Sequence, residues 1–119
     1  MAQKIKTREI TIVDEGGTFS VLLRRLGASN KKYDFDSLAA LRSLLSNEKA
    51  RILNTIKSKS PSSVYQLAKI LKRDFKSVSS DVNLLEKFGF IDLISEKTGK
   101  RKRYRPIVVV DVINLNIRI

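Results

Sequence analysis

Cysteine and histidine are both absent from this 119-residue chain. Their absence excludes disulfides, thiol redox sensing and the common zinc sites, which are built from these residues. It also excludes acid–base catalysis by histidine and nucleophilic catalysis by cysteine. No pair of carboxylates stands out in an apolar setting, and Asp14-Glu15-Gly16-Gly17 lacks the downstream Gly-Lys-Ser/Thr of a phosphate-binding loop. We therefore expect no enzymatic activity, no metal site and no cofactor.

Long apolar runs are also lacking. No segment is apolar for long enough to span a membrane, and the N-terminus has no signal-peptide pattern. The sequence shows neither an internal repeat nor a low-complexity segment. These absences predict a cytoplasmic protein without a membrane partner, and the length of 119 residues predicts one domain with a small appended element.

Negative charge is scarce, whereas positive charge is abundant and concentrated. The chain has 24 Lys and Arg against 12 Asp and Glu, which gives a net charge of +12. Residues 60–105 hold 11 of these cations and 5 of the anions, and residues 97–105 hold six cations and no anion. A local excess of this kind favours a polyanionic partner, although a basic charge balance can also serve solubility alone.

The N-terminal region is predicted to contain a strand and a short helix. Residues 4–13 are β-branched and partly alternating, which favours a strand, and residues 14–17 form a turn. Thr18 is in position to cap a helix that Gly27 would close, and residues 28–34 read as a polar loop. The apolar face of that helix would consist of Phe19, Leu22, Leu23 and Leu26. Residues 1–35 form a candidate dimerisation element.

Residues 36–110 are predicted to form an α+β domain, mostly helical with a β-hairpin. Helices are expected to begin near Asp36 and near Ser46. Ser63 and Gln66 have the spacing of a capping box, Asp74 is suited to cap the following helix at 75–88, and Gly89 is suited to end it. Strands are then predicted at residues 90–95 and 104–110, with residues 96–103 as the loop between them.

The C-terminal segment, residues 111–119, alternates strictly. Its apolar residues are Ile113, Leu115, Ile117 and Ile119, with polar residues between them. Period-two alternation predicts a half-buried strand. Such a strand is a second candidate for dimerisation, beside the strand predicted at residues 4–13.

The predicted helix at 75–88 has two distinct faces. Phe75, Val78, Val82 and Leu85 would face the core, while Lys76, Ser80, Asn83 and Lys87 lie opposite. A helix–turn–helix followed by a basic hairpin is the outline of a winged helix, which places one helix in the major groove of DNA. An ordinary solvated face would have the same composition, so the argument depends on the neighbouring turn and hairpin.

The side chains suit different parts of duplex DNA. Asn83 can bond adenine, Ser79 and Ser80 can bond base edges, and Lys76 can reach a base or a phosphate. The start of the helix at residue 63 suits a phosphate, and the hairpin suits the backbone or the minor groove. Asp81 would either pair with a hairpin arginine or sit at the helix edge. The full set of predicted DNA contacts is Ser62, Ser63, Lys72, Arg73, Lys76, Ser77, Ser79, Ser80, Asn83, Lys87, Lys97, Lys100, Arg101, Lys102, Arg103 and Arg105.

Residues 48–110 resemble the winged-helix regulators of the MarR and ArsR type. The resemblance is carried by Val64-Tyr-Gln-Leu-Ala68, by Val78-Ser-Ser-Asp-Val82 and by Leu85-Glu-Lys-Phe-Gly-Phe-Ile91. It is strongest toward small archaeal and bacterial regulators that carry a "DVxLLExxG" string and a basic wing. The resemblance implies a homodimer that binds an operator with the helix at 75–88. The chain departs from ArsR metal sensors in lacking Cys and His, and it shows no long dimerisation helices of the MarR type.

Three functions therefore remain open. The first is a sequence-specific, dimeric transcriptional regulator that binds double-stranded DNA and lies with the nucleoid when bound. The second is an architectural or segregation protein with little sequence preference and a steep salt dependence. The third is an antitoxin or another winged helix that docks onto a protein. RNA fits less well, because the hairpin carries a single aromatic residue, Tyr104.

Overall fold

The protein has a mixed α+β fold that divides into two compact units. The computed structural model describes residues 5–14, 16, 19–24, 31–33 and 35–119. Unit 1 consists of residues 1–44 and 110–119, and unit 2 consists of residues 45–109. The helix predicted near Asp36 thus belongs to unit 1, although we predicted it as part of a domain of residues 36–110.

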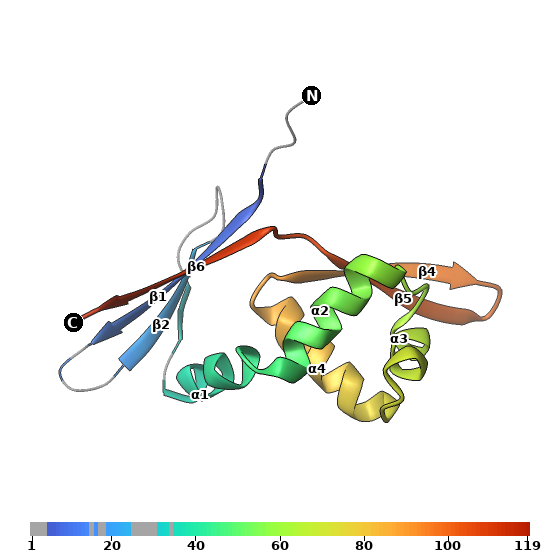
Figure 1. Ribbon diagram of the computed structural model, residues 1–119, viewed down its shortest axis with the longest axis horizontal. Coiled ribbons are helices and arrows are strands. Elements are labelled where there is room, and N and C mark those ends of the chain that lie inside the picture. Colours follow the sequence, from blue (N-terminus) through green and yellow to red (C-terminus); the bar gives the residue numbers. More distant parts are fainter. Residues whose placement is uncertain (1–4, 15, 17–18, 25–30, 34) are drawn as a thin grey trace. The chain divides into compact units, whose positions relative to one another are not determined.

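Unit 1 is a four-stranded sheet with one helix (Figure 1). The strand order is β3-β2-β1-β6, with β1 antiparallel to β2 and parallel to β6. The first and last strands of the chain are therefore neighbours. Ile10, Ile12, Leu41, Leu44 and Val110 are its buried apolar side chains among those described. The elements are β1 (Thr7–Asp14), β2 (Phe19–Arg24), β3 (Lys31–Tyr33), α1 (Phe35–Leu44) and β6 (Val112–Arg118).

Two predictions for unit 1 are wrong. Residues 19–24 form strand β2 instead of a helix, and residues 31–33 of the predicted polar loop form strand β3. The apolar run 21–23 fits helical and extended periodicity equally well, and hydrogen bonding to β1 from Glu9 to Asp14 selects the extended form. Thr18, Leu26 and Gly27 lie outside the described residues.

The strand predicted at residues 4–13 is confirmed as β1, and the C-terminal strand is confirmed as β6. The predicted half-burial of β6 holds for Ile113 alone, because Leu115, Ile117 and Ile119 are exposed. β1 is hydrogen-bonded on both sides, by β2 and by β6, so it has no edge left for pairing with a second chain. The structure thus removes the β1 alternative for dimerisation by strand pairing.

Unit 2 contains three helices followed by an antiparallel hairpin (Figure 1). The N-caps are Ser46, Ser63 and Asp74, each accepting a hydrogen bond from a backbone N–H three residues on. Gly89, with φ +79°, follows the last helix as predicted. The elements are α2 (Asn47–Lys59), α3 (Val64–Leu71), α4 (Phe75–Lys87), β4 (Ile91–Thr98) and β5 (Arg101–Val108).

Unit 2 has its own apolar core. Val78, Val82 and Leu85 of α4 are fully buried, as their helical spacing predicted. Phe75 was also predicted to face the core but is 48% exposed, because it stands at the first position of α4. The remaining fully buried side chains of this core include Ile52, Leu67, Phe88, Phe90 and Ile91.

The loop predicted at residues 96–103 is much shorter in the structure. β4 continues to Thr98 and β5 begins at Arg101, so the turn consists of Gly99 and Lys100. Gly99 has φ +64° and Lys100 has no positive φ, which matches a type II′ hairpin turn. The backbone hydrogen bonds between β4 and β5 hold residues 96–98 and 101–103 in strand conformation, although most of these residues are charged.

Candidate functional site

Helix α4 presents a polar surface opposite its buried side. Lys76, Ser80, Asn83 and Lys87 are all exposed, which confirms the two-faced helix that the sequence predicted. Ser77 is exposed too, but its backbone N–H donates to Asp74 Oδ2 at 3.1 Å, and its Oγ lies 3.5 Å from the same oxygen. Ser77 is therefore part of the helix cap.

One flank of α4 faces the hairpin. Ser79 and Asn83 line a depression together with Leu93 of β4 and Tyr104 of β5. Ser79 is half-buried there, while Asn83 remains exposed. These two residues, which the sequence selected for base contacts, therefore lie between the exposed surface of the helix and the hairpin.

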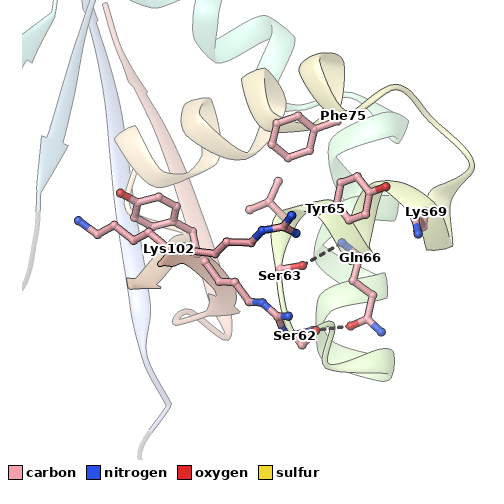
Figure 2. Close-up of a pocket in the computed structure, with 11 residues that line it drawn as sticks. Ser62, Ser63, Tyr65, Gln66, Lys69, Phe75 and Lys102 are labelled. Atoms are coloured by element: carbon pink, nitrogen blue, oxygen red, sulfur yellow. Dashed lines mark hydrogen bonds between the residues drawn. The ribbon is translucent and has the colours of Figure 1, made fainter. Parts of the chain in front are cut away.

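The start of α3 is closed by two local hydrogen bonds (Figure 2). The Gln66 backbone N–H donates to Ser63 Oγ at 3.0 Å, and the Ser62 N–H donates to Gln66 Oε1 at 2.6 Å. The capping-box spacing is thus confirmed, except that the glutamine returns to Ser62 instead of Ser63. The cap fixes both serines at the opening of a groove.

That groove separates the start of α3 from the hairpin and has a volume of about 500 Å³. Ser62, Ser63 and Gln66 line one side, and Figure 2 shows Lys102 of the hairpin across from them. Arg101 and Arg103 also line it, so three consecutive cations of β5 border the same space. The sequence predicted both groups of residues, and the structure places them together.

The same groove gathers three exposed aromatic side chains, Tyr65, Phe75 and Tyr104. The rings of Tyr65 and Phe75 are 6.1 Å apart, centroid to centroid. Lys69 Nζ lies 4.7 Å from the centre of the Tyr65 ring, and Lys102 Nζ lies 5.8 Å from that of Tyr104. Sequence reasoning missed this cluster because it counted aromatics in the hairpin alone. Tyr65 could have been found, since it lies off the apolar stripe of α3.

The hairpin holds most of the remaining cations. Lys97, Lys100, Arg101, Lys102 and Arg103 are exposed, and none of them forms an ion pair with another described residue. Arg105 differs, because its Nε donates to Glu96 Oε1 at 2.9 Å. Residues 101, 103 and 105 share one face of β5, because side chains alternate between the two faces of a strand. Five of the six predicted hairpin cations thus have no ion-pair partner in the part of the chain that the structure describes.

Arg73 and Asp81 belong to an ion-pair network that joins α2 to α4. Arg73 lies 3.0 Å from Asp81 and 3.2 Å from Glu48, and the buried Lys49 ammonium lies 3.2 Å from Asp81. Asp81 therefore pairs with these residues, which corrects the alternative that it holds a hairpin arginine. Lys72 is exposed at the end of α3, with left-handed backbone at φ +57°.

Other kinds of site find no support in the part of the chain that the structure describes. No described helix is long and apolar enough to cross a membrane. No three His, Cys, Asp or Glu side chains gather there in a way that could hold a metal ion. The groove and the exposed surface of α4 are thus the strongest candidate site.

A family model described as HVO_A0114 matches residues 44–115, which is more than half of the chain. The match includes all of unit 2 and extends into β6. No curated protein matches the chain.

Proposed function

The chain belongs to the HVO_A0114 family, and we propose that it binds double-stranded DNA through unit 2 as a sequence-specific transcriptional regulator. In this proposal unit 2 is a winged helix-turn-helix, with α3 and α4 as the two helices and the β4–β5 hairpin as the wing. The observation that carries it is the groove in which the capped start of α3 meets Arg101, Lys102 and Arg103. This groove borders α4 at Phe75. One continuous surface therefore offers cations for phosphates and hydrogen-bonding side chains for base edges.

The charge distribution supports a polyanionic partner for unit 2. This unit holds 15 of the 24 Lys and Arg but 6 of the 12 Asp and Glu, a net charge of +9. Neutralising phosphates releases counterions from the duplex, so each cation that meets a phosphate raises affinity at low salt. The five unpaired hairpin cations are the residues best able to do this.

The exposed side chains of α4 support base contacts. An α-helix fits the major groove, where lysine can bond guanine and asparagine can bond adenine through two hydrogen bonds. Lys76, Ser80 and Asn83 are on the exposed surface of α4. On its opposite side, Val78, Val82 and Leu85 are buried and anchor the helix in the core of unit 2. In the proposed complex α4 reads bases while the hairpin contacts the backbone or the minor groove.

Fluorescence anisotropy with two duplexes tests this proposal. One duplex is selected from random sequence by repeated enrichment on the protein, and the other is unselected. The double variant Arg101→Ala/Arg103→Ala should weaken binding to both duplexes and lower the slope of log K against log salt by about 2. Asn83→Ala should instead reduce the preference for the selected duplex by about tenfold or more.

A control pair removes the same charge elsewhere. Arg51 and Lys57 are exposed on α2, and neither lines the groove. Arg51→Ala/Lys57→Ala should therefore leave both affinities closer to wild type than the hairpin variant does. Equal losses for the two double variants would mean that bulk charge drives binding, and they would overturn the proposed interface. A salt-sensitive affinity without any enriched motif would favour the architectural alternative.

The aromatic cluster favours a second candidate, single-stranded nucleic acid. Exposed aromatic rings in a basic groove can stack on bases, and each stack contributes about 1–3 kcal/mol. Tyr65→Ala/Tyr104→Ala should then cost at least about tenfold in affinity for a single strand, with little effect on the duplex. If wild-type protein binds the duplex more tightly at equal salt, this second candidate fails.

A further inference from the structure

Strand β6 is an edge strand without the usual protection. It lies at the end of the order β3-β2-β1-β6, and no strand among the described residues pairs with its outer side. Natural edge strands are commonly short, charged, kinked or interrupted by proline, because an open edge invites another strand. β6 has seven residues, Val-Ile-Asn-Leu-Asn-Ile-Arg, with Arg118 as its one charge and no proline. Its sequence therefore permits pairing.

The apolar face of β6 continues a face that is buried on β1. The register places Leu115 beside Ile10 and Ile117 beside Ile12. Residues paired in this way project from the same face of a sheet. Ile10 is 0% exposed, whereas Leu115 is 45% and Ile117 is 59% exposed. This face of the sheet is therefore buried at β1 but exposed at β6, where its side chains are apolar.

The sequence of β6 favours a second copy of this chain as the partner, because its five central residues form a palindrome. Ile113-Asn114-Leu115-Asn116-Ile117 reads the same in both directions. When two copies pair antiparallel about Leu115, leucine meets leucine, and each Ile113 meets the partner's Ile117. Asn114 likewise meets the partner's Asn116 on the opposite face, where amide side chains can bond one another. A two-fold axis at Leu115 pairs each residue with the one equally far on its other side, so the palindrome makes every pair in this stretch a match of like with like.

We propose that a second copy of this chain pairs with β6 in antiparallel orientation, with the two-fold axis at Leu115. The two sheets would become one continuous eight-stranded sheet. The other edge is a poorer partner, because β3 is three residues long. This inference concerns unit 1 and does not rest on DNA binding. If DNA binding also holds, the dimer brings two copies of unit 2 to one site.

A single engineered cysteine tests the axis, because the natural chain has none. Opposite Cα atoms in an antiparallel pair are about 4.5–5.5 Å apart, within the range that a disulfide spans. Full-length Leu115→Cys should therefore form a covalent dimer under mild oxidation, seen on a non-reducing gel. Ile117→Cys is the matched control, since the two copies of that position would lie about 14 Å apart. It should stay largely monomeric on the gel.

Opposed charges provide a second test that needs no oxidation. Leu115→Lys places two like charges against each other in a homodimer, and Leu115→Glu does the same with the other sign. Each should raise the dimer dissociation constant about tenfold or more in sedimentation velocity experiments. A mixture of the two variants should dimerise again, because opposite charges then meet at the axis. Circular dichroism of each variant checks that the fold is intact.

The outcomes separate clearly. Rapid cross-linking of Leu115→Cys together with rescue in the mixed charge variants supports the proposal. Wild-type protein that sediments as a monomer at every concentration up to about 100 µM would overturn the proposal. Its dimer dissociation constant would then be far higher than that of a stable complex. Equal cross-linking of Leu115→Cys and Ile117→Cys would also overturn it, because the proposed register forbids the second. None of these results depends on DNA, so the proposed function can fail or stand separately.

Discussion

The two units differ in what they expose. Unit 2 buries its large core side chains and exposes cations, with a net charge of +9. Unit 1 has a net charge of +3 and leaves Leu115 and Ile117 exposed on an open edge. A charged surface suits a polyanion, because its affinity comes from counterion release, whereas an exposed apolar strand suits a protein partner. The contrast is the reason that we propose different partners for the two units.

Replacing one apolar residue in each unit should give the largest difference in the free energy of unfolding between the two units. Phe88 is 1% exposed in unit 2, so Phe88→Ala should lower the free energy of unfolding by about 3–5 kcal/mol. Leu115→Ala, measured by urea denaturation at concentrations where the chain is monomeric, should cost about 0.5 kcal/mol or less. A larger loss from Leu115→Ala in the monomer would mean that this residue belongs to the core of unit 1.

The ion-pair network supplies the next largest effect. Asp81→Ala removes the acidic partner of the buried Lys49 and should destabilise the protein by about 3 kcal/mol, because a buried charge is left uncompensated. Lys49→Met/Asp81→Leu removes both charges and should recover most of that loss in the same denaturation experiment. If the double variant is as unstable as Asp81→Ala, the network contributes through Arg73 and Glu48 instead.

The helix caps should contribute less. Ser63→Ala removes the acceptor of the Gln66 N–H, which should cost about 1 kcal/mol of stability in thermal or urea denaturation. Ser58→Ala is a matched control. The Ser58 hydroxyl is exposed on α2 and donates to the Asn54 carbonyl, which already belongs to a helix. The control should change stability by about 0.5 kcal/mol or less. Equal effects would show that Ser63 does not act as a cap.

The helices and caps of unit 2 could be predicted because their signals are local. Ser63, Asp74 and Gly89 each act on a backbone group within a few residues, so spacing alone locates them. Strand β2 could not be predicted in this way. Its conformation depends on pairing with β1, and the run 21–23 carries no local feature that excludes a helix.

In the candidate site, too, features with local signals could be predicted from the sequence, whereas contacts between elements could not. The hairpin cations could be found from their concentration in the sequence, and the polar face of α4 could be found from helical spacing. The pairing of Asp81 with Lys49 and Arg73 could not, because it needs α2 to be packed beside α4. The aromatic cluster likewise joins Tyr65, Phe75 and Tyr104 from three elements. Contacts between elements are what the one-dimensional pattern lacks.

The smallest expected effect concerns the shape of the hairpin turn, as distinct from its charge. Gly99 has φ +64°, and a Cβ added there meets nothing within 4 Å, so Gly99→Ala suffers backbone strain but no clash. The strain of about 1–2 kcal/mol is partly offset by the lower entropy of the unfolded chain, which leaves a net loss of about 0.5–1 kcal/mol. Gly99→Asn should lose less, because asparagine is among the residues favoured in turns of type II′. Both variants keep every hairpin cation, so their DNA affinity should exceed that of Arg101→Ala/Arg103→Ala. If Gly99→Ala matched the arginine variant in lost affinity, the shape of the turn would outweigh its charge, and the contrast between a charged unit and an apolar unit would no longer explain binding.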